Sequence, residues 1–460
     1  MKSSELMPSY ENLLQSFLNN TIGRNGDVWD FCRILDGIEG RFSIAIDSSW
    51  GSGKTFFIKQ SKMLLDALNP NIVINDSTHK DSIIRTCNRI SNGYHVELQP
   101  QVCVYYDAWK NDNDVDPIIS IVYSILTEMD TNFHFSSESK IFSIALAIAD
   151  CVTGKNIKAI FDSTKTSSIF DSIHSEKSLE GEISDFLDSL LLEKGQRLIV
   201  FVDELDRCKP TYAVQVLERI KHYFCNDRIT FVFSINAKEL EHTIRNYYGT
   251  DFDSGRYLDR FFDLRIDLPK PNESSFYRSI GFNDSRYWFD AICDAFIKTY
   301  NLSMREQIRY FDATKPVKDY ANAQVFYSTG MGEAKTKILP IMIGLKMRSA
   351  LLYEQFISGK DSMPLIEVAK NAPSGCFNFL LSKGESYAED EILADGKSSI
   401  LLENRLDDYY KAIFAPQFPQ KGSHCIQIGA IDIMDNTAEV LKYAASGLKF
   451  YEDKESKVYG

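Results

Sequence analysis

The 460-residue sequence lacks several patterns that mark common classes of enzyme. Its nine cysteines include no Cys-x-x-Cys pair for zinc and are odd in number, which favours reduced thiols over a disulfide framework. They are Cys32, Cys87, Cys103, Cys151, Cys208, Cys225, Cys293, Cys376 and Cys425. None of the seven histidines belongs to an HExxH or His/Cys metal pattern, and no serine or cysteine has a nucleophile-elbow context. The sequence therefore gives little support for a zinc enzyme or a covalent hydrolase.

The sequence also lacks a long apolar run. Residues 1–5 lead into mixed polar sequence instead of the apolar core of a signal peptide. The longest suspicious run, residues 141–152, is broken by Ser143 and Asp150 and is shorter than the ~18–20 residues that a bilayer requires. We expect a cytoplasmic protein without membrane contact.

An excess of positive charge is absent as well. With 51 basic and 64 acidic residues the net charge is −13, which argues against general attraction to nucleic acid and leaves a local basic groove as an open alternative. Hydrophobic residues make up 44% and charged residues 25%, so we expect an ordinary folded core. Because one core rarely exceeds about 250–300 residues, we also expect more than one domain.

Four short hydrophobic runs predict buried strands, at residues 42–46, 102–106, 198–202 and 229–235. Each run is followed by helical sequence; Asp116-Pro117, for example, has the form of an N-cap with proline at the first helical position. Strands that alternate with helices indicate an α/β fold with a parallel sheet flanked by helices. In such folds ligands bind at the carboxyl ends of the strands.

Changes in composition predict the domain organisation. We expect an α/β domain over residues 1–270, with short N-terminal helices and an excursion at about 131–178 that is rich in Ser, Lys and Asp. After Pro269 and Pro271 the strand signals give way to long helical patterns, which predicts a helical bundle over 271–365. Residues 366–460 then form a C-terminal extension, either an ordinary helical one or an interaction module.

The first predicted strand runs into a glycine-containing loop and then a helix, the context that a phosphate-binding P-loop requires. Backbone N–H groups of such a loop surround phosphate oxygens, and the helix N-terminus adds positive charge. Lys54 would reach the β- and γ-phosphates of ATP, and the Thr55 hydroxyl would coordinate Mg²⁺. The predicted nucleotide-binding residues here are Trp50, Gly51, Ser52, Gly53, Lys54, Thr55 and Phe56.

The loop departs from the GxxxxGK[ST] pattern at Ser48, which stands where the first glycine belongs. A serine fits if its φ is ordinary, whereas a required positive φ would cost on the order of 1 kcal/mol. The competing interpretation is a Gly/Ser turn that happens to precede Lys-Thr.

The third predicted strand delivers two carboxylates at its carboxyl end. Asp203 is placed to hold the water shell of Mg²⁺, and Glu204 to orient or deprotonate the attacking water. Taken alone, the pair is also compatible with a solvated acidic turn. Beside the P-loop we interpret it as the metal and catalytic carboxylates.

Further polar residues follow the fourth predicted strand. Asn236 would contact the γ-phosphate or the attacking water, or simply cap the next helix. An arginine donated across a subunit interface can stabilise transition-state charge. The arginines in this region are Arg256, Arg260 and Arg265; each also has a structural interpretation, and Arg260 is our candidate.

With these residues in place, the chain resembles the KAP family of P-loop NTPases, a group related to AAA+ and STAND ATPases, over roughly residues 12–345. Residues 50–55 are similar to the Trp-containing Walker A motif of the family, with Ser48-Ser49 in place of the usual Gly-Glu. Residues 203–208 are similar to its Walker B motif, with Glu204 where a second aspartate is commoner.

Three more segments carry the resemblance. Residues 105–109 (Tyr-Tyr-Asp-Ala-Trp) are similar to a strand-end Phe-Asn-Ala-Trp element, and residues 257–262 followed by Leu268-Pro269 are similar to a Tyr-Leu-acid-base segment. Residues 301–306 resemble the start of a helical bundle. By this resemblance Arg305 is a candidate sensor that touches nucleotide from the second domain.

The resemblance implies a Mg²⁺-dependent protein that binds and hydrolyses ATP as an oligomeric switch or scaffold. Many family members carry membrane helices between the two Walker motifs, where this chain has only the 131–178 excursion, so a soluble member is implied. The family includes phage-exclusion and antiviral-defence ATPases. The implied setting is bacterial antiphage defence, and the implied partners are further copies of the chain and a protein effector.

Two other functions stay open. One is a binding scaffold that uses ATP as a structural ligand with little turnover, which the serine at position 48 and the unassigned arginine finger favour. The other is a P-loop kinase of a small molecule. The kinase has less support because Asp203-Glu204 followed by Asn236 suits activation of water better.

Overall fold

The computed structural model describes most of the chain. The described residues are 7–72, 77–91, 98–114, 116–133, 181, 183–188, 190–191, 195–280, 288–322, 330–383, 385–387, 399–417 and 424–446. The chain forms two compact units, the first from Leu6 to Ser279 and the second from Ile280 to Gly460. Most of the predicted excursion at 131–178 lies outside the described residues; its first three residues end a helix.

The first unit is built on a five-stranded parallel sheet with the order β2-β3-β4-β1-β5. Its strands are β1 (Phe42–Asp47), β2 (Gln101–Asp107), β3 (Arg197–Asp203), β4 (Ile229–Ile235) and β5 (Leu264–Asp267). β1, β3 and β4 are buried almost throughout, as their hydrophobic runs predict. The four predicted strands are confirmed. β5 was missed because it is a short edge strand whose residues are mostly exposed and alternate with charges.

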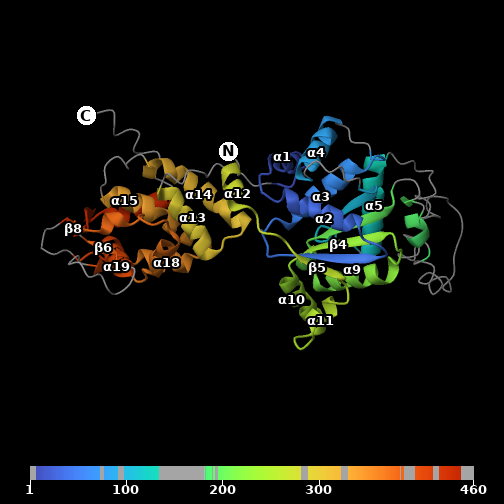
Figure 1. The fold of residues 1–460 in the computed structure, drawn as a ribbon. Helices are drawn as coiled ribbons and strands as arrows, with labels where there is room; N and C mark the ends of the chain where they lie inside the picture. The colour runs from blue at the N-terminus through green and yellow to red at the C-terminus, as the bar shows by residue number, and fades with distance from the viewer. Residues whose placement is uncertain are drawn as a thin grey trace. The chain divides into compact units, whose positions relative to one another are not determined.

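Helices cover both faces of this sheet (Figure 1). The elements are α1 (Tyr10–Asn19), α2 (Asn25–Asp36), α3 (Lys54–Leu68), α4 (Ser77–Ile90), α5 (Pro117–Phe133), the 3₁₀ turn η1 (Leu205–Arg207), α9 (Pro210–Tyr223), α10 (Ala237–Tyr248), α11 (Ser254–Leu258) and α12 (Glu273–Ser279). α3 packs on one face with α2 and α4 behind it, while α9 and α10 cover the other face together with α5. The predicted α/β fold, a parallel sheet flanked by helices, is confirmed.

The strand register brings the carboxyl ends of the strands to one edge of the sheet. Asp47 of β1 is level with Ile235 of β4, and Asp107 of β2 is level with Asp203 of β3. Polar residues begin where the buried strands end, since a carboxylate inside the apolar core would be costly. This edge therefore gathers the polar side chains of several strands.

The second unit is mainly helical, in agreement with the predicted helical C-terminal region. Its elements are α13 (Trp288–Tyr300), α14 (Met304–Asn322), α15 (Gly330–Lys337), α16 (Leu339–Arg348), α17 (Ala350–Ile357), α18 (Met363–Asn371), η2 (Asn378–Leu380), β6 (Ser386–Tyr387), β7 (Ser399–Ile400), α19 (Leu402–Phe414), β8 (Cys425–Ile428), β9 (Ile431–Met434) and α20 (Thr437–Ser446). β6 pairs with β7 in parallel, and β8 with β9 antiparallel. These two small sheets are additional to the predicted helices. The predicted domain limits near 270 and 365 stay predictions.

The core of the second unit is close-packed around aromatic side chains. Phe296 of α13 stacks on Tyr310 of α14, whose hydroxyl donates to the carbonyl of Pro340 at 3.0 Å. Gly344 of α16 lies against the Phe296 ring so closely that an added Cβ would come within 2.3 Å of it. A side chain at position 344 would therefore force α13 and α16 apart.

Candidate active site

The candidate P-loop connects β1 to α3 at the carboxyl edge of the sheet. Gly51 and Gly53 have positive φ angles of 80° and 92°, a conformation that glycine adopts without a steric penalty. Ser48 is not among the described non-glycine residues with positive φ, so its backbone is ordinary. The serine in place of the first glycine is thus accommodated without backbone strain.

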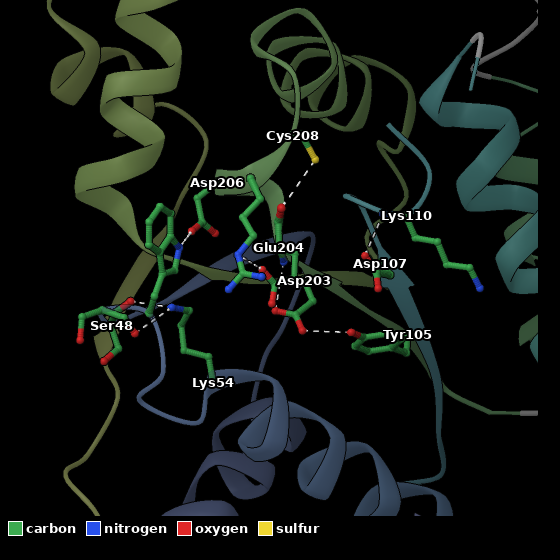
Figure 2. Close-up of polar contacts among 12 residues, drawn as sticks. Ser48, Lys54, Tyr105, Asp107, Lys110, Asp203, Glu204, Asp206 and Cys208 are labelled. Atoms are coloured by element: carbon green, nitrogen blue, oxygen red, sulfur yellow. Dashed lines mark hydrogen bonds and ion pairs between the residues drawn. The ribbon is translucent and has the colours of Figure 1, made fainter. Parts of the chain in front are cut away.

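Lys54 is buried at the start of α3 and turns back over the loop. Its Nζ donates to the carbonyl oxygens of Ser48 and Ser49, at 2.6 and 3.2 Å (Figure 2). Burial lowers the pKa of Lys54, and the carboxylates of Asp206 and Asp203 oppose that shift. A cation held among loop carbonyls can exchange these weak acceptors for phosphate oxygens.

Arg24 supports the loop through a hydrogen bond to its backbone. No local sequence pattern indicated this role. The side chain precedes α2 and is only 4% exposed, and its Nη1 donates to the carbonyl of Ser52 at 3.0 Å. Burial lowers the pKa of Arg24 to about 10. The hydroxyl of Ser52 is itself buried without a hydrogen-bonding partner among the described residues.

Asp203 ends β3 and is 1% exposed. Its Oδ2 accepts a hydrogen bond from the Tyr105 hydroxyl at 3.0 Å, and its Oδ1 accepts one from the backbone N–H of Glu204 at 3.1 Å (Figure 2). The ammonium group of Lys59 lies 4.1 Å from the centre of the Tyr105 ring. These contacts fix the orientation of a carboxylate that would otherwise be costly to bury.

Glu204 follows directly in a left-handed conformation, with φ 60° and ψ 25°. A non-glycine residue in this region costs of order 1 kcal/mol or more, and such strain is concentrated at functional sites. The turn brings Oε2 of Glu204 within 2.6 Å of Nε of Arg207. Burial, and next the charge of Asp203, raise the pKa of Glu204 to about 7, although Arg207 opposes the shift.

The Walker B turn is also joined to the P-loop. The indole Nε1 of Trp50 donates to Oδ2 of Asp206, a buried carboxylate in η1. The guanidinium carbon of Arg207 lies 5.7 Å from the centre of the Trp50 ring and 5.5 Å from that of Trp109. Trp50, Asp206 and Arg207 therefore connect the two motifs that the sequence predicted only separately.

The residues at this edge fit a nucleoside triphosphate. Two positive-φ glycines and the α3 N-terminus form an anion cradle, which the buried Lys54 ammonium and the unpartnered Ser52 hydroxyl complete. Within the described part of the chain, no group of three or more His, Cys, Asp or Glu residues could hold a metal ion by itself. Mg²⁺ does not require one, because it commonly uses one or two carboxylates with phosphates and water. The hard oxygens of Thr55 and Asp203 suit this metal.

The other predicted site residues are placed differently. Asn236 caps α10, its side chain accepting from the N–H of Glu239 at 3.4 Å, and the predicted contact with phosphate or water stays a prediction. Arg260 borders a pocket with Ser43 and Asp263 at the amino-terminal end of the strands, away from Lys54. It does not join the site of its own chain.

The other predicted arginines are Arg256 and Arg265 of the first unit and Arg305 of the second. Arg265 of β5 is paired with Asp47 at 3.4 Å, and Arg256 is an exposed residue of α11. Arg305 is the second residue of α14 in the second unit, so its predicted contact with nucleotide stays a prediction. Phe56 is buried in the first turn of α3.

Comparison with protein families agrees with this geometry. The model of the KAP family P-loop domain matches residues 31–280. The chain belongs to the KAP family of P-loop NTPases. Membership indicates that this domain binds nucleotide and, in general terms, uses a divalent metal. No curated protein matches the chain.

The matched range begins in α2 and ends one residue beyond the first unit, so it contains both Walker motifs of this KAP chain. None of the helices that the structure describes is both long and apolar enough to cross a bilayer.

Proposed function

We propose that this KAP protein is a Mg²⁺-dependent ATPase. The observation that carries the proposal is the convergence of Lys54, Asp203 and Glu204 at one edge of the sheet, beside a loop shaped for phosphate. Phosphoryl transfer to water requires an ammonium group that binds phosphate, a carboxylate that binds the metal and a second carboxylate that activates the water.

Each side chain has a task in that reaction. Lys54 leaves the carbonyls of Ser48 and Ser49 and binds the β- and γ-phosphates. Glu204 orients the attacking water and accepts its proton, for which a pKa near the working pH is suitable. Ser52 and the N–H groups of the loop hold the phosphates in place.

Thr55 and Asp203 would hold the magnesium ion, with the carboxylate acting through the water shell. When bound, Mg²⁺ neutralises charge that develops on the phosphate oxygens. Tyr105 and the N–H of Glu204 keep the Asp203 carboxylate in the required orientation.

Three assignments extend the site beyond these residues. Asn236, which caps α10 after the end of β4, would also contact the γ-phosphate. Arg260, which lies away from the Lys54 of its own chain, would act as a finger only on the nucleotide of a second copy. Arg305 would act as a sensor from the second unit.

We further propose that ATP turnover drives an oligomeric switch that acts with a protein effector in bacterial antiphage defence. The support is the resemblance to KAP proteins of that setting. The −13 net charge does not favour nucleic acid as the partner, and we propose a cytoplasmic location.

The test is phosphate release from ATP and Mg²⁺ by the purified full-length chain. Glu204→Gln should lower kcat by about 10²–10⁴-fold and leave nucleotide affinity nearly unchanged, the effect of losing a general base. Lys54→Ala should weaken nucleotide binding. Glu11→Gln, which alters an exposed carboxylate of α1, is the matched control and should behave as the unsubstituted chain.

The same variants separate the alternatives in cells challenged with phage. Protection that survives Glu204→Gln but is lost in Lys54→Ala would replace the ATPase switch with a scaffold that only binds ATP. Labelled γ-phosphate found on an acceptor other than water would replace it with a kinase. Equal phosphate release by the unsubstituted chain and both variants would contradict an ATPase altogether.

A further inference from the structure

Arg207 forms an ion pair with the carboxylate of Glu204. Its Nε lies 2.6 Å from Oε2, and both side chains are mostly shielded from solvent. Among the described residues, none donates a hydrogen bond to the other oxygen, Oε1. The described residues therefore hold the carboxylate through Oε2 and provide no hydrogen-bond donor to Oε1.

Two tryptophans flank the guanidinium group. The Arg207 Cζ atom lies 5.7 Å from the centre of the Trp50 ring and 5.5 Å from the centre of the Trp109 ring. Trp50 belongs to the P-loop and is itself held by Asp206, whereas Trp109 follows β2. Arg207 thus contacts side chains from the loops that follow β1, β2 and β3.

Both tryptophan residues are exposed to solvent, with exposed fractions of 45% for Trp50 and 52% for Trp109. An arginine positioned near two tryptophan ring faces is attracted to them by the cation–π interaction. A guanidinium group held in this way loses less conformational freedom when it pairs with a carboxylate. The tryptophans accordingly restrict where Arg207 can lie.

The backbone of Glu204 directs its side chain into this arrangement. Its φ of 60° is one of three positive values at described non-glycine residues, the others being those of Asn20 and Asn301, a residue type that tolerates this conformation. A glutamate has no such tolerance, so surrounding contacts must maintain the conformation. The ion pair with Arg207 is one of them.

We propose that Arg207 is a positioning residue for Glu204 and that Trp50 and Trp109 set the place of its guanidinium group. The inference rests on the proposed ATPase function. Arg207 holds Oε2 so that Oε1 meets the attacking water, in the way that a catalytic base is oriented by a third group. Because Trp50 is part of the P-loop, Arg207 also connects the phosphate-binding loop to Glu204, the proposed base.

The first experiment separates kcat from nucleotide affinity in the full-length chain. Arg207→Gln should lower kcat about 10- to 100-fold, the range for residues that orient a functional ligand, and leave the affinity for a fluorescent ATP analogue unchanged. Arg207→Lys, which keeps the charge, should recover part of the loss. Arg33→Gln, an exposed arginine paired with Asp30 at the same i,i+3 spacing, is the matched control.

The role of the tryptophans is tested by a double-substitution cycle. Trp109→Leu alone should lower kcat by less than Arg207→Gln does, and the combined variant should be no slower than Arg207→Gln alone, since Trp109 acts through Arg207. Additive losses would mean that the ring supports the site independently. Circular dichroism and thermal unfolding identify variants that fail to fold. If Arg207→Gln or the combined variant fails to fold, the kcat values of Arg207→Lys and Trp109→Leu test the proposal instead.

A second readout does not depend on hydrolysis. Acrylamide quenching of Trp109, obtained as the difference between each chain and its Trp109→Phe counterpart, should rise in Arg207→Gln and in Glu204→Gln but not in Arg33→Gln. If the unsubstituted chain does not hydrolyse ATP, the proposed function fails, and this quenching result alone decides the link between Arg207 and Trp109.

Three results would overturn the inference. One is an unchanged or increased kcat in Arg207→Gln, because a positioning residue cannot be removed without loss. Another is a fall in nucleotide affinity as large as the fall in kcat, which would indicate a merely structural turn. The third is Trp109 quenching that does not respond to either substitution.

Discussion

Asp203 illustrates how single residues are fixed at this site. Tyr105 and the backbone N–H of Glu204 each hold one of its oxygens, so the carboxylate has one orientation in a buried position. A carboxylate oriented in this way can hold the water shell of a metal ion whose other ligands are phosphate oxygens and water.

We therefore expect Asp203→Asn to uncouple nucleotide affinity from Mg²⁺. In the unsubstituted chain, adding Mg²⁺ should tighten ATP binding. In Asp203→Asn the affinity for ATP in the presence of Mg²⁺ should be about 10- to 100-fold lower, because the amide lacks the negative charge that attracts the metal. Titrations with and without Mg²⁺ measure the effect. Asp30→Asn, an exposed aspartate of α2, serves as control, and an Mg²⁺ response that survives in Asp203→Asn would exclude this metal role.

At the residue scale, local motifs predicted Lys54, Asp203 and Glu204, because the spacing of each motif is set within one strand-loop-helix segment. The supporting contacts were not predicted. Arg24 lies 28 residues from Ser52, and Tyr105 lies 98 residues from Asp203. Such pairs meet only after the sheet has formed, so no local pattern records them.

At the scale of elements, α3 is joined to α5 by charge as well as by packing. Lys62 of α3 lies 2.6 Å from Asp66 and 2.8 Å from Glu128 of α5, and all three side chains are largely buried. Because α3 begins at the P-loop, this contact also helps to hold the loop on the sheet.

Lys62→Ala should destabilise the first unit by about 3 kcal/mol, because it leaves two carboxylates buried without their cation. Arg33→Ala removes a surface pair with Asp30 and should cost less than about 1 kcal/mol. Urea unfolding followed by circular dichroism compares the two. Similar midpoints for both variants would show that the buried pair contributes no more than a surface one.

The elements themselves were predicted unevenly. β4 was predicted with its observed limits, and β1, β2 and β3 to within one residue at either end, because long buried strands have continuous hydrophobic runs. β5 and the four short strands of the second unit were not predicted. They are two to four residues long, which is too short for a periodic pattern.

For the whole molecule, the family match covers residues 31–280, which is most of the first unit and only Ile280 of the second. The proposed Arg260 finger requires a second copy, since Arg260 lies away from its own P-loop. We therefore expect the mass of the particle to increase when ATP and Mg²⁺ are added.

Light scattering of the full-length chain measures that change. Lys54→Ala should stay at the mass of the nucleotide-free form, and Arg260→Gln should assemble but hydrolyse ATP slowly, because the finger acts after assembly. A constant mass under all conditions would rule out the nucleotide-driven oligomer.

We propose, above all, that this KAP chain hydrolyses the ATP that its P-loop binds. The most direct measurement is the identity of the nucleotide that remains on the protein after incubation with ATP and Mg²⁺ and removal of free nucleotide. We predict ADP on the unsubstituted chain and intact ATP on Glu204→Gln, because only the step that activates water is lost. Intact ATP on both chains, or ADP on both in equal amounts, would contradict the account.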